Sequence, residues 1–176
     1  MLDRRSTLAT AHPFSWAALT LGEVRNFTLT QVAGFAKDFE IGLAEVAGSL
    51  PQANDQAVES SGRTIFRTGA VTFWFVGPEN DDLATKLAGK AIVTPLTSSR
   101  TRISIEGRAA REVLLKGIPI DLHPSIFTPG KFAMTGVHHT PVLLHCVRED
   151  RFELYAMRTF ALNIWEWLED AALEFK

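Results

Sequence analysis

The sequence predicts an α+β fold made of two split-βαβ-like halves, with a largely antiparallel sheet and helices outside it. One observation is the alternation of two apolar periods. Segments of period two, typical of strands, are interspersed with segments of period three to four, typical of helices. A second is their order, strand–helix–strand–strand–helix–strand, which then recurs in much the same form. The halves share no recognisable sequence repeat, so the predicted duplication is one of pattern only.

The first half follows an arm at residues 1–20, which we expect to be loosely ordered and held by Phe14 and Trp16. Residues 21–176 are then expected to form a single domain. The segment Val71–Val76 is apolar on both faces except at Thr72, which indicates a central strand. The elements expected here are a strand at 24–32, a helix at 34–47, a mobile polar loop at 49–62, a hairpin with arms at 63–67 and 71–76, a helix at 78–88 and a strand at 91–96.

The second half is organised around residues 102–122. Ile103 and Ile105 alternate with polar residues as in a strand, and Gly107 interrupts that alternation. A short helix follows, with Gly117 as its expected C-cap. The apolar positions of this helix are Ala110, Val113 and Leu114. Two strands are expected next, at 131–138 and 142–147, around a turn centred on Thr140 and Pro141. A strand at 152–157 and a last helix capped by Thr159 complete the chain.

Composition narrows the classes of function. The formal net charge of -2 provides no basic field for non-specific nucleic-acid binding. No stretch approaches the roughly eighteen apolar residues of a membrane span, and residues 1–22 lack the apolar run of a signal peptide. Cys146 is the single cysteine, so no intrachain disulfide can form. We therefore expect a cytoplasmic protein.

Motifs for cofactor binding are missing. No two glycines stand as G-x-G, and the sequence holds no G-x-x-x-x-G-K-[ST] phosphate loop. Gly107 could offer backbone N–H groups to an anion, with Arg108 and Arg111 nearby, but an ordinary turn is the favoured interpretation. We expect no cofactor-binding residue in this chain.

A metal site is considered at His138, His139, His145 and Cys146. Neighbouring residues of a strand point to opposite faces, which disfavours such a cluster, so we expect no metal site. Cys146 is expected to be buried and inert.

No side chain is convincingly activated for catalysis. Ser98 and Ser99 lack a local base, and Asp121 fits a capping role better than that of a general base. We expect no catalytic residue.

The last helix favours an interaction protein. Trp167 and Phe160 flank an apolar stripe that is complete without them, so Trp167 is either a wide core contact or an anchor for another subunit. The C-terminal half of this helix is acidic, although the helix dipole disfavours anions there. The stripe consists of Ala161, Ile164, Trp165, Leu168, Ala171, Ala172 and Phe175, and the acidic residues are Glu166, Glu169, Asp170 and Glu174.

Three runs resemble the gamma subunit of heterotetrameric sarcosine oxidase: GRAAREVLLKGIPIDLHPSIF, FAMTGVHHTPVLLH and FELYAMRTFALNIWEWLEDAALEF. The resemblance implies a fold like the folate-binding domain of the glycine-cleavage T-protein, and a complex with alpha, beta and delta subunits. That complex demethylates sarcosine oxidatively to glycine and passes the one-carbon unit to tetrahydrofolate. Its FAD, FMN and NAD lie on the larger subunits and its zinc on the delta subunit, while the gamma subunit is non-catalytic. Candidate partner-interface residues are Trp167, Phe160, His139 and Arg158.

Alternative functions stay open at this point. One is the small subunit of a related N-methyl amino-acid dehydrogenase, for example one acting on N-methylglutamate. Another is a free-standing folate-binding protein, for which Asp121 and Trp74 are nominal candidates as the acidic group and the aromatic platform. A third is a homo-oligomeric scaffold.

Overall fold

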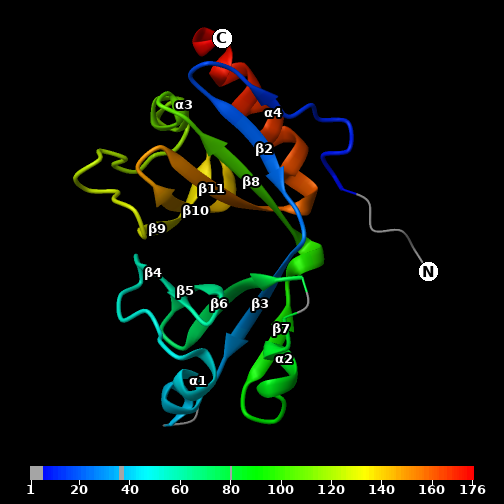
Figure 1. The fold of residues 1–176 in the computed structure, drawn as a ribbon, viewed down its shortest axis with the longest axis vertical. Helices are drawn as coiled ribbons and strands as arrows, with labels where there is room; N and C mark the ends of the chain where they lie inside the picture. The colour runs from blue at the N-terminus through cyan, green and yellow to red at the C-terminus, as the bar shows by residue number, and fades with distance from the viewer. Residues whose placement is uncertain (1–5, 36–37, 80) are drawn as a thin grey trace. The chain divides into compact units, whose positions relative to one another are not determined.

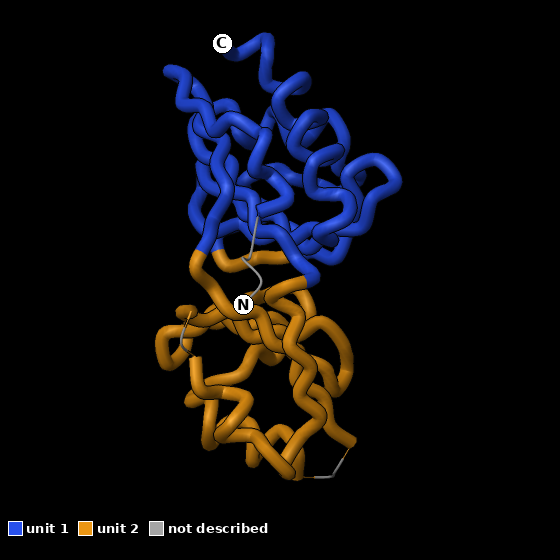
Figure 2. Tube along the Cα trace, turned by 90° about the vertical axis from the view of Figure 1, so that its right-hand side faces the viewer, with its two compact units in different colours: residues 1–25, 99–129, 133–176 blue, residues 26–98, 130–132 orange. Residues whose placement is uncertain are grey.

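The computed structural model describes residues 6–35, 38–79 and 81–176. The chain forms two compact units, shown in Figure 2. Unit 1 combines residues 1–25, 99–129 and 133–176, and unit 2 combines residues 26–98 and 130–132.

Unit 2 is a five-stranded antiparallel sheet with the strand order β4-β5-β6-β3-β7 (Figure 1). Strand β6 lies between β5 and β3, which confirms the central position expected for the apolar run at 71–76. The elements are β3 (Phe27–Ala33), α1 (Phe39–Ala47), β4 (Ala57–Ser60), β5 (Arg63–Gly69), β6 (Thr72–Pro78), α2 (Leu83–Lys86) and β7 (Ile92–Pro95).

The helices of unit 2 pack on one face of this sheet. Phe39 and Leu43 of α1 and Leu83 of α2 share a buried cluster with residues of β3, β5 and β6. The sheet contributes Val32, Ile65, Phe73 and Phe75 to this cluster.

Unit 1 is a six-stranded sheet with the order β1-β2-β8-β11-β10-β9. Its helices are α3 (Ala110–Leu115) and α4 (Ala161–Ala172), and its strands are β1 (Phe14–Ser15), β2 (Thr20–Val24), β8 (Arg100–Glu106), β9 (Phe132–Val137), β10 (Thr140–Arg148) and β11 (Arg151–Met157). Short 3-10 helices are η1 (Thr97–Ser99), which contains the boundary between unit 2 and unit 1 along the chain, and, in unit 1, η2 (Arg158–Phe160) and η3 (Leu173–Phe175).

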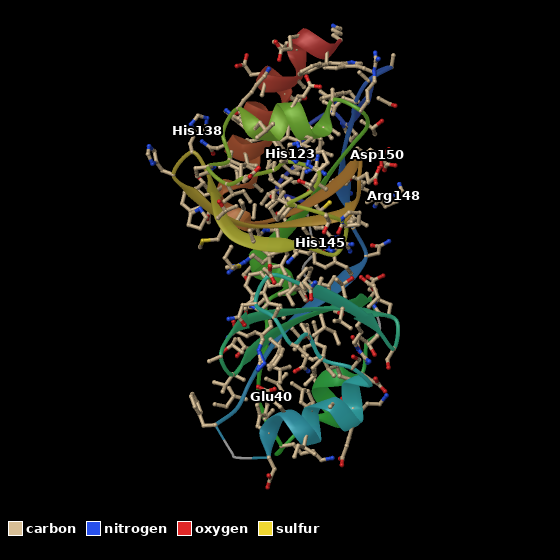
Figure 3. The ribbon with its side chains drawn as sticks, turned by 90° about the vertical axis from the view of Figure 1, so that its left-hand side faces the viewer. Glu40, His123, His138, His145, Arg148 and Asp150 are labelled. Atoms are coloured by element: carbon tan, nitrogen blue, oxygen red, sulfur yellow. The ribbon has the colours of Figure 1, made fainter. Side chains whose placement is uncertain are left out.

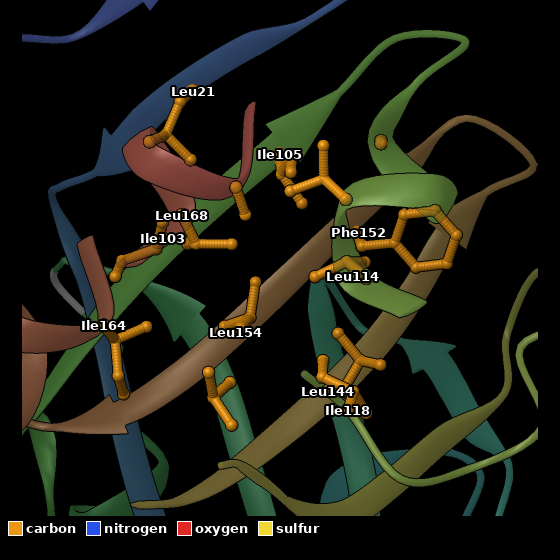
Figure 4. Packing of buried hydrophobic residues seen from close by; sticks show 14 of the residues in the cluster. Leu21, Ile103, Ile105, Leu114, Ile118, Leu144, Phe152, Leu154, Ile164 and Leu168 are labelled. Atoms are coloured by element: carbon orange, nitrogen blue, oxygen red, sulfur yellow. The ribbon is translucent and has the colours of Figure 1, made fainter. Parts of the chain in front are cut away.

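Helices α3 and α4 cover one face of the unit 1 sheet. Figure 4 shows Ile103 and Ile105 of β8 packed with Leu114 of α3 and with Ile164 and Leu168 of α4. The expected apolar positions of both helices are buried, apart from the half-buried Phe175. Period-3.6 patterning therefore located both helices correctly.

The α+β class and the split-βαβ pattern are confirmed, but the halves are not consecutive in sequence. In unit 2 the order β5-β6-β3-β7 places the first strand between the third and the fourth. Unit 1 has the same arrangement, β10-β11-β8-β2, and takes its fourth strand from the N-terminal part of the chain. The expected single strand at 24–32 is therefore wrong, because this segment contains parts of two strands. These are β2 and β3, separated at Asn26, which has a φ of 58°.

Several expected boundaries in the first half are corrected. Helix α1 begins at Phe39 rather than at 34, and residues 36–37 lie outside the described part. The expected mobile loop at 49–62 contains β4, paired with β5. Helix α2 spans only Leu83–Lys86, and Asp81, before its start, pairs with Arg63 and accepts a hydrogen bond from Leu83 N–H at 3.0 Å.

Two expectations in the second half are also wrong. The turn between β9 and β10 is at His138 and His139, with His138 at a φ of 51°, and Pro141 lies inside β10. Thr159 does not cap the last helix. It lies within η2, and α4 starts after Phe160 without a side-chain cap hydrogen bond.

The expected arm at 1–20 contains β1 and the buried residues Leu8, Ala18 and Leu19, within its described part. The rings of Phe14 and Trp16 stack with their centroids 3.9 Å apart. The division into an arm and one domain from residue 21 stays a prediction.

A buried ion pair links β5 to the start of α2 in unit 2. Arg63 Nε and Nη2 donate to the two Asp81 carboxylate oxygens at 2.7 and 2.5 Å, and both side chains are less than a tenth exposed. Burial acts to raise the pKa of Asp81, but the Arg63 hydrogen bonds, the Leu83 N–H and the Arg63 and Lys86 charges together lower it. The bidentate geometry offsets the cost of removing both charges from water.

We expect Asp81→Asn to lower the free energy of unfolding by about 3–5 kcal/mol at pH 7, because it removes the bidentate partner of the buried Arg63 charge and leaves only the longer contact with Asp82. The folded pKa of Asp81 is lowered, so this stabilisation is complete above about pH 4 and is lost as the pH falls through the folded value. Urea unfolding at pH 7 and at successively lower pH should therefore show the free energies of unfolding of the wild type and Asp81→Asn approaching each other. Asp82→Asn is the control, because Asp82 is exposed and its contact with Arg63 is longer, 3.4 Å. An equal loss in both variants would contradict the prediction.

Candidate partner-binding surface

The candidate interface residues lie along α4 and the segments beside it in unit 1. Phe160 precedes α4 and Trp167 lies seven positions later, so the two share one side of the helix. Phe160 is 41% exposed, and Trp167 is half-buried against the core. Arg158 is half-buried in η2. The structure thus places these three candidates on the same helical region.

Trp167 is held by two segments from elsewhere in unit 1. A side chain at Gly117, just after α3, would overlap the Trp167 ring. His138 packs edge-on against that ring, with centroids 5.3 Å apart, and its backbone N–H donates to Gly117 O at 3.0 Å. His139, the sequence candidate, is the exposed residue next to it in the turn. The result is a fixed aromatic group at the unit 1 surface.

The acidic end of α4 is partly balanced within the chain itself. Lys116 pairs with Glu174, donates a hydrogen bond to Ala171 O at 2.5 Å and lies over the Phe175 ring. A cation at this end also suits the helix dipole. Glu166 and Asp170 are exposed on α4, so negative charge remains next to Trp167.

The anion-binding hypothesis for the turn at Gly107 is not supported. Gly107 N–H donates to Asp150 O, and Ala109 N–H donates to Ala18 O. The Arg111 guanidinium donates to the carbonyls of Leu122, Phe127 and Glu149. These donors are therefore engaged by the fold itself.

The histidines and Cys146 do not form a metal cluster. Among the described residues, no group of three or more His, Cys, Asp or Glu side chains could hold a metal ion. Figure 3 shows His138 and His145 apart on the β9–β10 hairpin. Cys146 is buried on the helix-covered face, and burial raises the pKa of its thiol. An inert thiol is the consequence expected from the sequence.

The candidates for other chemistry have local structural roles. Asp121 Oδ1 accepts a hydrogen bond from His123 N–H at 2.8 Å, as in an Asx turn. Trp74 lies in unit 2 and donates its indole N–H to Gln31 Oε1 at 3.1 Å. Ser99 accepts hydrogen bonds from Arg100 Nη1 through its carbonyl oxygen at 3.3 Å and its Oγ at 3.2 Å, and Ser98 is exposed.

Sequence reasoning missed a charged cluster on the other face of the unit 1 sheet. Glu153 is 1% exposed. It accepts hydrogen bonds from Arg102 Nε at 2.9 Å, Tyr155 Oη at 3.1 Å and Arg151 Nη2 at 3.3 Å. The period-two placement of Arg102 on β8 and of Arg151 and Glu153 on β11 was the available signal.

His145 lies opposite Glu153 in the β10–β11 pairing. Burial lowers the pKa of His145 to about 4, while the Glu153 charge acts to raise it and the Arg102 charge to lower it. The imidazole is therefore neutral at pH 7.

Comparison with known proteins identifies the family. The model of the "Sarcosine oxidase, gamma subunit family" matches residues 82–174. The sarcosine oxidase subunit gamma of Corynebacterium sp. (strain U-96) is 31% identical over 98% of this chain and 91% of the relative. That of Arthrobacter sp is 30% identical over 83% of this chain and 77% of the relative. The chain belongs to the sarcosine oxidase gamma subunit family. The resemblance thus extends beyond the three C-terminal runs.

Solved structures agree with this family. The heterotetrameric sarcosine oxidase from Corynebacterium sp. U-96, in complex with pyrrole 2-carboxylate, matches with a TM-score of 0.88 and 29% identity over 98% of this chain and 96% of that chain. The glycine cleavage system aminomethyltransferase T from Bartonella henselae matches with a TM-score of 0.68 and 18% identity over 86% of this chain and 45% of that chain. The second match confirms the expected T-protein-like fold.

In the described part of this gamma-family chain, no helix is both long and apolar enough to span a bilayer.

We expect the free energy of unfolding of the wild type to fall as the pH falls from 6.5 to 4. In this range His145 binds a proton in the unfolded chain but stays largely neutral in the folded one. The loss attributable to this group approaches about 3 kcal/mol at pH 4. Urea unfolding at pH 7, 5.5 and 4.5 measures it, and His145→Gln should show a shallower pH dependence. His139→Gln, at an exposed turn position, should match the wild type. Equal slopes for wild type and His145→Gln would refute the assignment.

Proposed function

We propose that this chain is the non-catalytic gamma subunit of a heterotetrameric sarcosine oxidase, assembled with alpha, beta and delta subunits. The observation that carries the proposal is the near-complete mutual coverage with a chain of the Corynebacterium enzyme, 98% and 96%, at a TM-score of 0.88. A chain that corresponds to one subunit over its whole length is best understood as the same component of an equivalent complex.

The complex would demethylate sarcosine oxidatively to glycine and pass the one-carbon unit to tetrahydrofolate. FAD, FMN and NAD would be held by the larger subunits, with none on this chain. The donors of the turn at Gly107 are used internally, which agrees with a supporting role. The single buried cysteine is compatible with work in the cytoplasm.

The chain would act by burying apolar surface against its partners. Unit 1 exposes large apolar side chains at Leu115, Ile126, Met134, Met157, Phe160 and Leu173. Phe160 and Leu173 lie at opposite ends of α4, with Trp167 between them. Aromatic groups held in place at a surface are typical energetic anchors of interfaces.

A pull-down of the tagged chain from its native host should recover flavin-containing chains in roughly four-subunit stoichiometry. The isolated chain should show no flavin absorbance, because the cofactors are proposed to lie on its partners. Recovery of the chain alone would reject the proposal. Micromolar binding of tetrahydrofolate by the isolated chain would instead favour a free-standing folate-binding protein.

Phe160→Ala should weaken recovery of the partners about ten-fold or more while leaving urea unfolding of the isolated chain nearly unchanged, because an exposed ring contributes little to the core. Trp167→Ala should reduce both the recovery of the partners and the stability of the isolated chain, since the Trp167 ring also packs on Gly117 and His138. Thr20→Ala, at an exposed position on β2, is the control. Unchanged partner recovery with Phe160→Ala would exclude this side of α4 from the interface.

A further inference from the structure

The sulfur-containing side chains of the described part lie in two contrasting environments. Its two methionines, Met134 of β9 and Met157 at the end of β11, are 56% and 39% exposed. Cys146 of β10, the single cysteine of the chain, is 0% exposed and belongs to the core cluster of unit 1. Methionine is among the side chains most often found buried in proteins. The structure thus places both thioethers at the surface and the thiol in the core.

Access and charge state decide which of these sulfur atoms reacts with a peroxide. A thiol reacts as its thiolate, and burial raises the pKa of the Cys146 thiol, so little thiolate is present at pH 7. Cys146 Sγ also donates to Arg148 O at 3.2 Å. A thioether has no proton to lose, so its reactivity depends mainly on access. Met134 and Met157 are therefore the reactive positions at neutral pH.

The oxidant expected near this chain is hydrogen peroxide. An oxidase that passes two electrons from its substrate to O2 forms this product, so the inference rests on the proposed function for its oxidant. An electron pair of the methionine sulfur attacks one peroxide oxygen, an S–O bond forms and the O–O bond breaks. The sulfur loses two electrons and becomes a sulfoxide, and the peroxide is reduced to water, which carries away both hydrogens.

Oxidation at these positions changes the surface rather than the core. A sulfoxide is polar, and an exposed sulfoxide keeps its hydration, so the folded state loses little free energy. Met157 directly precedes η2, which contains Phe160 of the candidate partner-binding surface. Covering a sulfoxide with an apolar partner would remove water from its oxygen at a cost in free energy. The modification therefore opposes association while the free chain stays folded.

We propose that Met134 and Met157 are sulfoxidation sites of the unassembled chain, and that hydrogen peroxide acting there weakens its association with the other subunits. Cys146 stays a thiol under the same conditions. Peroxide released by assembled complexes reaches unassembled copies of the chain by diffusion. Oxidation at these two positions thereby links the activity of the complex to the assembly of further copies.

The first test treats the purified full-length chain with excess hydrogen peroxide and follows each residue by peptide mass spectrometry. Met134 and Met157 should each gain one oxygen atom, and methionine sulfoxide reductases A and B together should remove it. Cys146 should remain open to thiol labelling after unfolding, and urea unfolding of the treated chain should match that of the untreated one. Oxidation of Cys146 ahead of both methionines, or methionines that stay unmodified, overturns the proposal.

The second test mixes the treated chain with the other subunits of the host oxidase, after catalase has removed the peroxide, and measures the flavin-containing chains recovered. Recovery should fall about ten-fold relative to the untreated chain. The matched control is the double variant Met134→Leu/Met157→Leu, which nearly conserves side-chain volume and has no thioether at either position. Peroxide should leave the recovery by this variant unchanged.

Equal losses in the wild type and the double variant, or no loss in the wild type, overturn the control of assembly by these methionines. If the untreated wild type recovers no flavin-containing chain, the proposed function fails and the control of assembly fails with it. The peptide measurement on the isolated chain still decides the two sulfoxidation sites in that case.

Discussion

Pairing of β8 on both sides is the constraint on which unit 1 depends. Residues 100–106 pair with β11, and residues 102–106 pair with β2. Ile103 and Ile105 thereby become the buried centre of the face that α3 and α4 cover. The partner strand β2 comes from some eighty residues earlier, so the second half of the chain cannot complete its sheet alone. This loop closure is what joins the N-terminal segment to the C-terminal core.

The sequence predicted those features that one local pattern determines. Helix α4 was found because its apolar residues form a full stripe, and β8 because Ile103 and Ile105 alternate with polar groups. The break between β2 and β3 was missed because no Gly or Pro marks it, and Asn26 takes the positive φ instead. Pro141 misled the turn assignment, since a histidine, His138, supplies the positive φ. Both errors arise where a non-glycine residue adopts an uncommon backbone conformation.

Local sequence patterns could not predict the contacts between segments that are distant along the chain. The place of Trp167 depends on Gly117 and His138, which are separated from it by about fifty and thirty residues. The Glu153 cluster likewise needs β8 beside β11 before Arg102 can reach it. Arg102, Arg151 and Tyr155 all donate to Glu153, so its buried charge is explained by hydrogen bonds and ion pairs within the sheet without invoking catalysis. Family membership could nevertheless be predicted, because three runs of the second half resemble the gamma subunit in their residues, and the family model matches residues 82–174.

The fold accounts for Gly107 and Gly117 of unit 1 but not for Gly42 of unit 2. Gly107 has a φ of 127° and lies against the backbone of Ala18, and Gly117 leaves room for Trp167, so the fold accounts for both. Gly42 has neither reason, yet it costs α1 about 0.5–1 kcal/mol relative to alanine. A Cβ atom at position 42 would meet no described atom within 4 Å, so neither a close approach nor a turn of the described chain requires glycine there.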